Sequence, residues 1–541
     1  MLLTKNLKVK FLGITPVLKD KTGVLNPQQI AAFSALLTFK GKSVNDLVKE
    51  TLKKGQKVED KVKTILLRSS LRGHASIATT PVISITYEGS KFIDWALTGL
   101  YFSSSLVSSG RRTNTTEKDI VYTKGIYGNK KARDIYRRAS EENIRLHNYF
   151  LAKGISKDEA RKILQQGIYG TGIIQLPVES IVGVKREYEA EKEWMPEEIG
   201  LLLKEIEKKS KDLGIDLLFA TREAAPRNIY PYPNIFKDPA KSNLVRELVK
   251  KEKLAKGAKI ISAEILATEG LRKKLKEFKQ KREAVFNSPK QIKKEWLNLL
   301  GLYQEIFRDY NSSLSFKTLS SVPICIWTEK KRHRTCRQII ESLYYCTDRA
   351  AKIFKKFEKQ IKRGEEDKSS SLFAIAREIE EVFSIPPSIK GNREYLAKYL
   401  SVASNAFKAY RTLLGLGIKP REAVFLIPRA VKIDILQEYD LYNFLTGYYP
   451  LRLCKTAEEE IHRNSWREII QIKEILRKKG AGFLGELVGP KCHIIGFCPE
   501  EKSCGLILPA VRNYNEKFHQ EMKEELQKQF EKNLKNLGSK R

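Results

Sequence analysis

The stretch Pro323-Ile324-Cys325-Ile326-Trp327-Thr328-Glu329-Lys330-Lys331-Arg332-His333-Arg334 leads an apolar segment directly into a cluster of cationic side chains. Its β-branched approach, which begins near Ser315, predicts an ordered segment that ends at a basic turn. Arginine has a planar fork that matches phosphate, and histidine is the side chain most easily poised near neutral pH. A solvated basic turn is the alternative, because Lys and Arg are frequent throughout the chain. The ordered approach favours a binding site at Arg332-His333-Arg334.

The composition is typical of a soluble globular protein with a strong positive charge. The 541 residues are 41% hydrophobic and 30% charged, and a chain of this length folds into about two to four domains. The net charge of +36 favours polyanionic partners, whether nucleic acid, nucleotides or phosphorylated cofactors. A general background charge explains it equally well. No apolar run is long enough to cross a membrane, and seven cysteines without a secretory leader favour a cytoplasmic protein.

The rest of the chain predicts strands alternating with long helices. Asn26 followed by Pro27 predicts the start of a helical region that continues to about residue 70. Alternating apolar residues predict an opening strand, and β-branched residues predict a second one. The expected strands are 1–11 and 81–87, the expected helices 131–153, 157–166, 393–415 and 457–479, the charged helical insertions 186–215 and 240–300, the loops 103–116 and 364–371, and the boundary between halves 224–233.

A pattern in the first half recurs in the second. Gly154-Ile155-x3-Glu159-Ala160 returns as Gly417-Ile418-x3-Glu422-Ala423, each time after a long helix. A β-like segment and a basic loop precede both copies. The sequence therefore predicts a diverged tandem duplication, with repeats at 1–200 and 201–510. A terminal amphipathic helix is expected at 511–541, where Phe518, Met522, Leu526, Phe530 and Leu534 recur every four residues.

The order of these motifs resembles the flavin-dependent thymidylate synthases. That family carries the signature Arg-His-Arg-x-x-Ser-x-Asn-Glu-x-Ser-x-Arg, and its first three residues match Arg332-His333-Arg334. The second signature Ser corresponds to Ser342, and Arg337 stands in place of the first. A Glu-Ala-Arg element of the family resembles Glu159-Ala160-Arg161 in the first half and Glu422-Ala423 in the second. Further matches are Gly73-His74-x-Ser76, Arg111, Glu117, Tyr122, Tyr345, Pro428 and Arg452.

The resemblance implies an α+β fold, with two diverged repeats of the thymidylate-synthase-complementing type that combine antiparallel sheets with long helices. It implies an enzyme that converts dUMP to dTMP with methylenetetrahydrofolate, using NADPH as reductant and FAD as cofactor. The family is a homotetramer with active sites between chains, so a fused pair would act as a pseudo-oligomer and split one site across its halves. The implied roles are cofactor binding for His74, Ser76, Arg332, His333 and Arg334, substrate binding for Arg161, Arg337 and Arg452, and catalysis for Ser342 and Arg452.

Departures from the signature leave a second interpretation open. Ile339, Ile340 and Tyr344 replace the signature Asn, Glu and final Arg, and Val424 replaces the Arg of Glu-Ala-Arg in the second half. Neither half carries a complete site by itself. The alternative is a non-catalytic descendant of the same fold that binds nucleotide or nucleic acid through its +36 charge.

The cysteines near the end of the chain form a separate candidate. Cys492, Cys498 and Cys504 are evenly spaced after Gly489-Pro490. With Cys454 or His493 as a fourth ligand, they predict a closed tetrahedral zinc site. Free thiols in a loop are the alternative, because the spacing differs from the short Cys-x2-Cys of established zinc motifs.

Overall fold

The structure, a computed structural model, describes residues 2–20, 23–109, 114–226, 232–252, 254, 257–286, 289–366, 371–495, 498–501, 503–506 and 516–538. The chain divides into two compact units. The first comprises residues 1–242, 323–332 and 340–433, and the second comprises residues 243–322, 333–339 and 434–541. These units interleave along the chain, whereas the expected repeats are consecutive, so the repeat boundaries stay a prediction. The combination of helices with antiparallel sheets confirms the α+β class.

The first unit is built on a four-stranded sheet in the order β2-β5-β8-β6, whose neighbouring strands are antiparallel. Ile83, Ile85 and Tyr87 of β5 are buried at alternate positions, as expected for a strand with one face on the core. This confirms the strand predicted at 81–87. The strands are β2 (Lys8–Thr15), β5 (Val82–Ser90), β8 (Tyr169–Pro177) and β6 (Ser104–Val107), with a short parallel pair of β1 (Leu2–Leu3) and β7 (Val121–Tyr122) and a hairpin of β3 (Leu18–Asp20) and β4 (Gly23–Leu25).

Strand β6 corrects the loop predicted over 103–116. Its four residues pair with β8 from Ser104 opposite Gln175 to Val107 opposite Gly172. The Ser-rich composition suggested a loop, but a short edge strand needs only one neighbour and tolerates polar residues such as Ser104 at exposed positions. Arg111, which resembles a signature position, lies outside the described residues.

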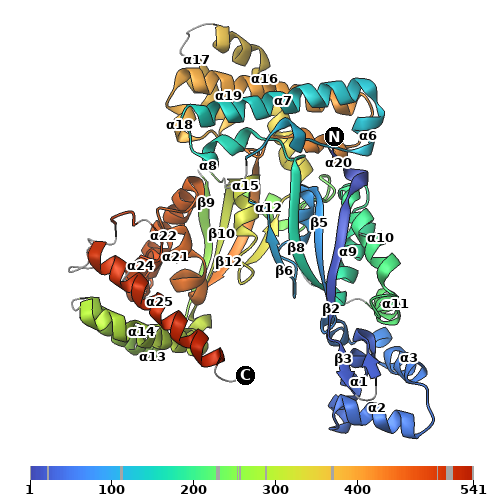
Figure 1. Cartoon of the computed structure of the whole chain (residues 1–541). Helices are drawn as coiled ribbons and strands as arrows, with labels where there is room; N and C mark the ends of the chain where they lie inside the picture. The colour runs from blue at the N-terminus through green and yellow to red at the C-terminus, as the bar shows by residue number, and fades with distance from the viewer. Residues whose placement is uncertain are drawn as a thin grey trace. The chain divides into compact units, whose positions relative to one another are not determined.

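Long helices of the first unit pack against one another (Figure 1). Helix α7 (Lys130–Ala152) lies beside α19 (Arg393–Gly415), which also packs on α16 (Leu343–Glu366). The side chain of Asn129 accepts a hydrogen bond from the backbone of Ala132 and begins α7, and Asn392 does the same at the start of α19. The helices predicted at 131–153 and 393–415 are confirmed to within one residue.

The helix predicted over 157–166 ends early. Helix α8 (Lys157–Ala160) is followed by a 3-10 turn, η4 (Arg161–Ile163), and the chain is then extended. Leu164 leaves the helix because its carbonyl accepts a hydrogen bond from the backbone of Arg429, so tertiary pairing overrides local helix preference.

Shorter helices complete the first unit. Asn26 caps the first of them through a reciprocal capping box with Gln29, which confirms the predicted helix start. The helices are α1 (Pro27–Lys40), α2 (Val44–Lys53), α3 (Val58–Arg68), α4 (Ser76–Thr79), α5 (Lys91–Leu97), α6 (Lys124–Gly128), α9 (Val178–Ala190), α10 (Glu197–Lys209), α11 (Asp216–Ala224), α15 (Ile324–Lys330), α17 (Ser371–Ile379), α18 (Pro387–Lys390) and α20 (Pro420–Ala423), with 3-10 turns η1 (Thr4–Asn6), η2 (Ser70–Arg72), η3 (Glu117–Asp119) and η6 (Val424–Leu426).

The second unit carries a sheet in the order β11-β12-β10-β9. Strand β9 (Ala258–Ile265) corrects the charged helical insertion predicted at 240–300. Its charged residues hid an edge strand, which pairs antiparallel with β10 (Leu314–Pro323). The other elements are β11 (Arg337–Ile340), β12 (Lys432–Asp440), α12 (Leu244–Glu252), α13 (Glu269–Phe286), α14 (Pro289–Tyr310), η5 (Asn311–Ser313), the π-turn η7 (Asn443–Gly447), α21 (Tyr449–Arg452), α22 (Glu459–Lys478), α23 (Gly482–Gly485), α24 (Lys491–Ile495) and α25 (Glu516–Gly538).

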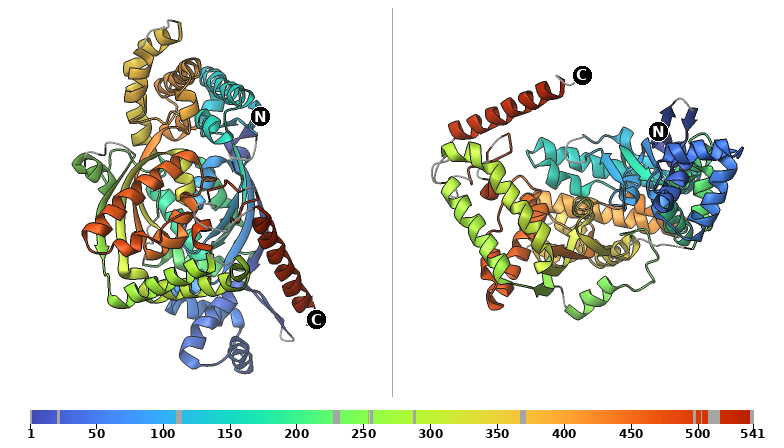
Figure 2. Two further views of the ribbon diagram at one scale, coloured as in Figure 1. Left: turned by 90° about the vertical axis from the view of Figure 1, so that its left-hand side faces the viewer. Right: turned by 90° about the horizontal axis from the view of Figure 1, so that it is seen from below.

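Helix α25 confirms the terminal helix, which Figure 2 shows in dark red. Met522 is fully buried and Leu526 packs against the same core, while Phe530 and Leu534 are exposed. The helix thus docks on its own unit through Met522 and Leu526. None of the described helices has the length and apolar character needed to cross a membrane.

Element boundaries recur with one constant offset in residue number. The offset from α7 (Lys130–Ala152) to α19 (Arg393–Gly415) is the same at both ends, and it equals the offset from β8 (Tyr169–Pro177) to β12 (Lys432–Asp440). The sheets share one strand order, because β9, β10, β12 and β11 occupy the places of β2, β5, β8 and β6. These particular helices and strands therefore follow one another in the same order in the two halves of the chain.

Candidate functional site

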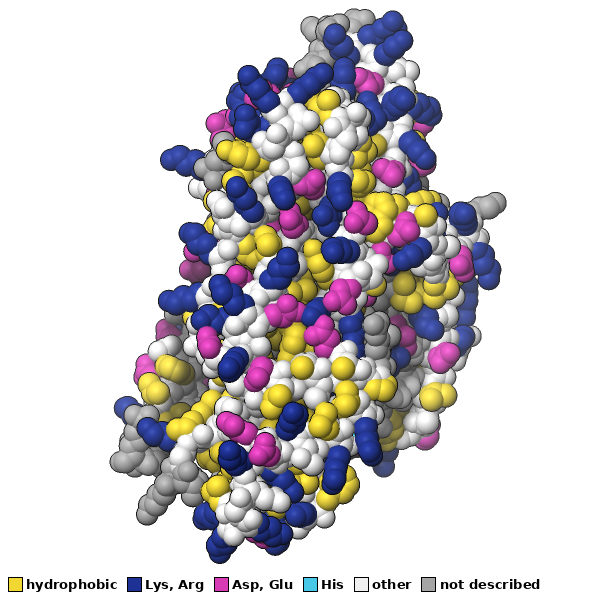
Figure 3. All heavy atoms as spheres, turned by 90° about the vertical axis from the view of Figure 1, so that its right-hand side faces the viewer, with side chains coloured by type: hydrophobic (Ala, Val, Ile, Leu, Met, Phe, Trp, Pro, Cys, Tyr) yellow, Lys and Arg dark blue, Asp and Glu magenta, His cyan; other side chains and the backbone are white. Residues whose placement is uncertain are grey.

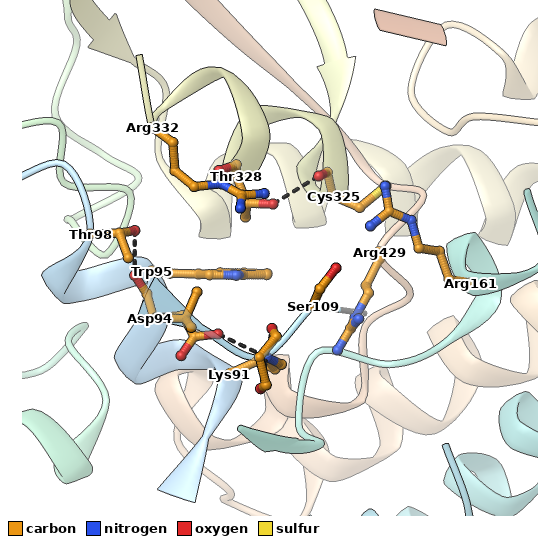
Figure 4. A pocket seen from close by; sticks show the side chains of 12 residues that line it. Lys91, Asp94, Trp95, Thr98, Ser109, Arg161, Cys325, Thr328, Arg332 and Arg429 are labelled. Carbon is orange, nitrogen blue, oxygen red and sulfur yellow. Dashed lines mark hydrogen bonds and ion pairs between the residues drawn. The ribbon is translucent and has the colours of Figure 1, made fainter. Parts of the chain in front are cut away.

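A pocket in the first unit is lined by residues of α5, of α15 and of the segments around them (Figure 4). The pocket is small, with a cavity volume of about 60 Å³, and it is partly open to solvent. Four of the lining side chains are cationic. The lining residues are Lys91, Asp94, Trp95, Thr98, Val107, Ser108, Ser109, Arg161, Cys325, Thr328, Arg332 and Arg429.

Helix α5 places Lys91 at the edge of the pocket. The helix follows β5 directly, Ser90 accepts a hydrogen bond from the backbone of Phe92 at its start, and all seven of its residues are buried. The Nζ of Lys91 lies 2.9 Å from Oδ2 of Asp94 and also donates to the hydroxyl and carbonyl of Ser108. Burial, together with Arg429 and Arg332 nearby, lowers the pKa of Lys91 to about 7.

The lowered pKa makes anion binding at this pocket depend on pH. Below about pH 7 Lys91 is protonated and adds a positive charge to the pocket, and above it the side chain becomes neutral. We expect the affinity for sulfate, whose own charge is constant here, to fall between pH 7 and 9 with a limiting slope of about tenfold per pH unit. Calorimetric titration at several pH values measures this slope.

The variant Lys91→Met provides the control for this pH dependence. It should bind sulfate more weakly at pH 6.5 and show a nearly flat profile from pH 7 to 9. A variant that keeps the wild-type slope would assign the pH dependence to another group.

Arg161 enters the pocket from the turn η4. Its Nη2 lies 2.8 Å from Oε1 of Glu329 on α15, and both side chains are almost wholly buried. Burial opposes the charge of Arg161, but Cys325, Glu329 and Asp158 outweigh it, so the pKa of the guanidinium is raised. Arg161 is therefore a permanent, buried positive charge.

Arg429 is a second buried cation of the pocket. Its side chain is 5% exposed, and its Nε donates to the carbonyl of Gln165 at 3.3 Å. Its Nη2 is buried without a hydrogen-bond partner among the described residues. Burial, and then Arg161, lower the pKa of Arg429 to about 10. An unpaired donor on a buried cation costs folding free energy, which an anionic ligand in the pocket would offset.

Main-chain pairing between two distant segments brings Arg161 and Arg429 together. The backbone N–H groups of Gln166 and Gly167 donate to the carbonyls of Ile427 and Phe425. In return, the N–H groups of Arg429 and Ala430 donate to Leu164 and Lys162. Gln165 and Pro428 face each other at the centre, where neither backbone N–H is needed, so proline fits.

The structure brings two of the predicted site residues into this pocket. Arg161 and Arg332 both line it, one from each half of the sequence. Arg332 is exposed, and its Nε donates to the carbonyl of Thr328 at 3.3 Å. The division between the two units falls directly after Arg332.

His333 and Arg452, both in the second unit, contact each other. The Nε and Nη2 of Arg452 lie 3.1 and 2.8 Å from Nε2 of His333. A guanidinium only donates, so Nε2 of His333 accepts and its ring proton is on Nδ1. The edge of the ring packs on Tyr448 at 4.8 Å between centroids.

The other predicted site residues do not line the pocket. Ser342 is buried and donates to the carbonyl of Lys237 at 2.6 Å, at the start of α16. Arg334 and Arg337 are exposed. His74 and Ser76 are exposed too, just after Gly73, whose φ of 105° ends the turn η2.

The sequence did not single out Lys91, Asp94, Trp95 or Arg429. Arg429 directly follows Pro428 of the element beginning at Glu422-Ala423, so its neighbourhood was marked even though the residue was not. Nothing in the sequence separates Lys91 from the other lysines, because its burial depends on a helix that is entirely covered.

The four predicted metal ligands lie in the second unit. Cys492 and Cys498 are buried in the same apolar core, which also contains Leu453 beside Cys454. Burial, followed by the proximity of Cys498, Cys454 and Cys504, raises the pKa of Cys492 to about 12. Across the described residues, no group of three His, Cys, Asp or Glu side chains is arranged to hold a metal ion.

Comparison with known proteins identifies relatives over part of the chain. Residues 311–476 match the family described as thymidylate synthase complementing protein. The flavin-dependent thymidylate synthase of Pyrococcus abyssi is 35% identical over 128 residues, which cover 23% of this chain and 50% of that protein. The corresponding protein of Pyrococcus furiosus is 32% identical over 124 residues, which cover 23% and 49%. The chain spans about half the length of the curated relatives it matches.

Solved structures give weaker likenesses. Thymidylate Synthase X from Helicobacter pylori with FAD and dUMP has a TM-score of 0.28 at 16% identity, covering 39% of this chain and 99% of that one. The UMP/dUMP methylase PolB from Streptomyces cacaoi bound with 5-Br dUMP has a TM-score of 0.31 at 10% identity, covering 42% and 98%. Because these scores are low, the assignment rests on the sequence matches. The segment from residue 311 to residue 476 is therefore similar in sequence to the thymidylate synthase complementing protein family and to part of the flavin-dependent thymidylate synthases.

Proposed function

We propose that this protein is a flavin-dependent thymidylate synthase, which methylates dUMP to dTMP with methylenetetrahydrofolate and takes its reducing equivalents from NADPH through FAD. The observation that carries the proposal is the pocket with four cationic side chains, two of which, Arg161 and Arg429, have a buried donor atom without a hydrogen-bond partner among the described residues. Its charge and hydrogen-bond donors suit the phosphate of a nucleotide. Relatives of the matched segment are named for this activity.

Residue roles follow from the donor set of the pocket. Arg161 and Arg429 would bind the phosphate of dUMP, because both are buried and charge-assisted hydrogen bonds are strongest where water is excluded. Arg332 would contact FAD from the exposed side. The roles proposed for His333, Arg334 and His74 with FAD, for Ser76, Arg337 and Ser342, and for Arg452 with dUMP rest on the resemblance of their motifs.

FAD would supply the redox chemistry, and the protein would bind and orient the reacting groups. Lys91, Arg161, Arg332 and Arg429 hold positive charge at the pocket, where it would attract the phosphates of substrate and cofactor. Trp95 offers a flat apolar surface beside them (Figure 4). This combination of charge and an aromatic face suits a nucleotide.

We further propose that the chain is a fused, diverged pair of repeats acting as a pseudo-dimer. Equivalent contacts across it support this. The backbone N–H of Gly125 donates to Glu422, and the backbone N–H of Ser388 donates to Glu159. Ser388 is the equivalent of Gly125, and Glu422 the equivalent of Glu159, at the separation in residue number that relates α19 to α7. The hydroxyl of Tyr136 donates to the carbonyl of Val121, and that of Tyr399 to Ser384.

Flavin content of the purified protein tests the proposed activity. We expect a yellow protein with bound FAD, and NADPH oxidation that depends on dUMP. The variant Arg332→Ala should retain less flavin. A colourless protein that binds nucleic acid with strong salt dependence would reject the enzyme and favour the non-catalytic alternative.

The charge distribution on one face of the protein bears on the nucleic-acid alternative. On the face in Figure 3, Lys and Arg side chains are spread widely, with Asp and Glu among them. Such scattered charge differs from the concentrated basic stripe of a nucleic-acid-binding surface.

Zinc at Cys454, Cys492, Cys498 and Cys504 is a second proposal for this protein. The thiols are close enough to affect the pKa of Cys492. Burial raises the pKa of the Cys498 thiol, and a hydrogen bond from the backbone of Glu500 offsets only part of this rise. Zinc would draw the four sulfurs to about 2.3 Å from the metal. Protein purified without chelators should contain one zinc per chain, measured by mass spectrometry.

Cys498→Ser should lose this zinc, whereas Cys346→Ala, at a buried thiol on α16, should keep it. A trace of zinc in the wild-type protein, or iron in its place, would reject the site.

A further inference from the structure

The pocket has a counterpart elsewhere in the first unit, defined by the repeated elements. The first and last residues of α15 (Ile324–Lys330) follow those of α5 (Lys91–Leu97) by the same number of positions, so α15 is the equivalent of α5. In the same way η6 is the equivalent of η4, at the larger separation in residue number that also relates α19 to α7. The main-chain bonds of Gln166 and Arg429 are equivalent at this larger separation. Each lining residue on these elements therefore has a definable equivalent.

Every cation of the pocket has an uncharged equivalent. Lys91 corresponds to Ile324, Arg161 to Val424, and Arg429 to Gln166. Arg332 corresponds to Gly99, just beyond the end of α5. None of the positive charge that lines the pocket is repeated at the equivalent position.

Packed apolar side chains occupy that equivalent position. Ile324 and Val424 are fully buried, and so are Phe92 and Trp327, the equivalents of Cys325 and Asp94. The ring of Phe92 contacts Phe425 at 4.5 Å and Trp95 at 5.1 Å between centroids. These packed side chains offer an anion no hydrogen-bond donor in place of Lys91 and Arg161, and they fill the space that it would need.

The one cation there is already engaged. Lys331, the equivalent of Thr98, is buried against Gly99, where an added Cβ would meet its Cγ at 2.9 Å. Its Nζ donates to the carbonyl of Trp95 and lies 5.1 Å from the centroid of the Trp327 ring. Lys331 thus fills the space that faces Gly99.

We infer that each chain has a single working copy of this phosphate-binding pocket, formed by Lys91, Arg161, Arg332 and Arg429, and that the equivalent second pocket is closed by Phe92, Ile324, Trp327 and Val424. This inference rests on the proposed duplication and refines the proposed function. Both halves contribute to the one pocket, with Lys91 and Arg161 from the first and Arg332 and Arg429 from the second. Half of a duplicated pair would therefore lack a complete site.

Binding stoichiometry on the full chain tests the inference. Titration calorimetry with inorganic pyrophosphate, and separately with dUMP, should give one site per chain for each. The two probes should compete. Two equal sites per chain would overturn the inference, and so would the absence of saturable pyrophosphate binding.

A pair of equivalent substitutions sharpens this test. Arg429→Met should weaken pyrophosphate binding at least tenfold, whereas Gln166→Met, at the equivalent position, should leave it within twofold of wild type. Equal losses in both variants would mean that both positions bind anions, which contradicts a single pocket. If pyrophosphate binds once per chain and dUMP does not compete, the proposed activity fails while the single pocket stands.

Discussion

Replacing Arg161 with Met is expected to lower the free energy of unfolding by about 3–5 kcal/mol, because the substitution leaves the buried carboxylate of Glu329 without its partner. The two groups are 2.8 Å apart, and their side chains are 6% and 3% exposed. Water cannot replace the guanidinium at such a position. Chemical denaturation followed by circular dichroism measures the loss as a shift of the unfolding midpoint.

The double variant Arg161→Met with Glu329→Met distinguishes the cost of the unpaired carboxylate from the cost of altered packing. Removing both charges eliminates the unpaired carboxylate, so the double variant should recover most of the lost stability. Arg137→Met, which breaks an exposed ion pair with Glu141 on α7, should unfold like the wild type. A double variant as unstable as Arg161→Met alone would show that packing, and not the unpaired charge, sets the cost.

Replacing Arg429 with Met is expected to weaken dUMP binding by about 10- to 150-fold, which corresponds to a charge-assisted hydrogen bond of about 1.5–3 kcal/mol. The reason is the buried Nη2 of Arg429, which has no hydrogen-bond partner in the described part of the chain and is available to a ligand. Titration calorimetry with dUMP measures the change.

Folding should respond in the opposite direction in this variant. Burial of the Arg429 charge and its repulsion by Arg161 both lower the stability of the folded protein, and both lower the pKa of Arg429. Its removal relieves both costs, so the unfolding midpoint should stay unchanged or rise. Arg411→Met, which removes one positive charge from α19, controls for net charge and should bind dUMP like the wild type. Weaker binding accompanied by a large loss of stability would assign Arg429 a structural role.

The sequence predicted part of the candidate site because two of its residues belong to local patterns. Arg332 stands in a basic triplet after an apolar segment, and Arg161 follows the Glu-Ala pair. Both line the pocket. Lys91 could not be predicted from the sequence, because its lowered pKa results from burial and from Arg429 and Arg332, which are distant in the sequence. The unpaired donor of Arg429 likewise depends on tertiary pairing with residues 162–167.

Fold prediction succeeded and failed for physical reasons as well. Helices α7 and α19 were predicted nearly to their ends, because each is long and amphipathic and begins at a capping Asn. Strand β9 was missed because its Lys and Glu residues, within a highly charged stretch, predicted a solvent-exposed helix. An edge strand accommodates such charged residues equally well. The helix predicted over 157–166 ends at Ala160, because the residues that follow form main-chain hydrogen bonds with the segment around Arg429 instead of continuing the helix.

The side chains of Gln166 and Arg429 each add one hydrogen bond across the pairing of residues 162–167 with 425–430. The rest of the pairing consists of hydrogen bonds between backbone groups. Such bonds survive almost any change of side chain, proline at a donor position excepted. The equivalent positions 429 and 166 can therefore carry different side chains, Arg and Gln, while the main-chain pairing of the two segments, called the joint below, is kept. Because both segments belong to one polypeptide, dilution cannot separate them, whereas an interface between separate subunits dissociates as the protein becomes scarce. The joint should therefore persist at the lowest concentrations a cell maintains.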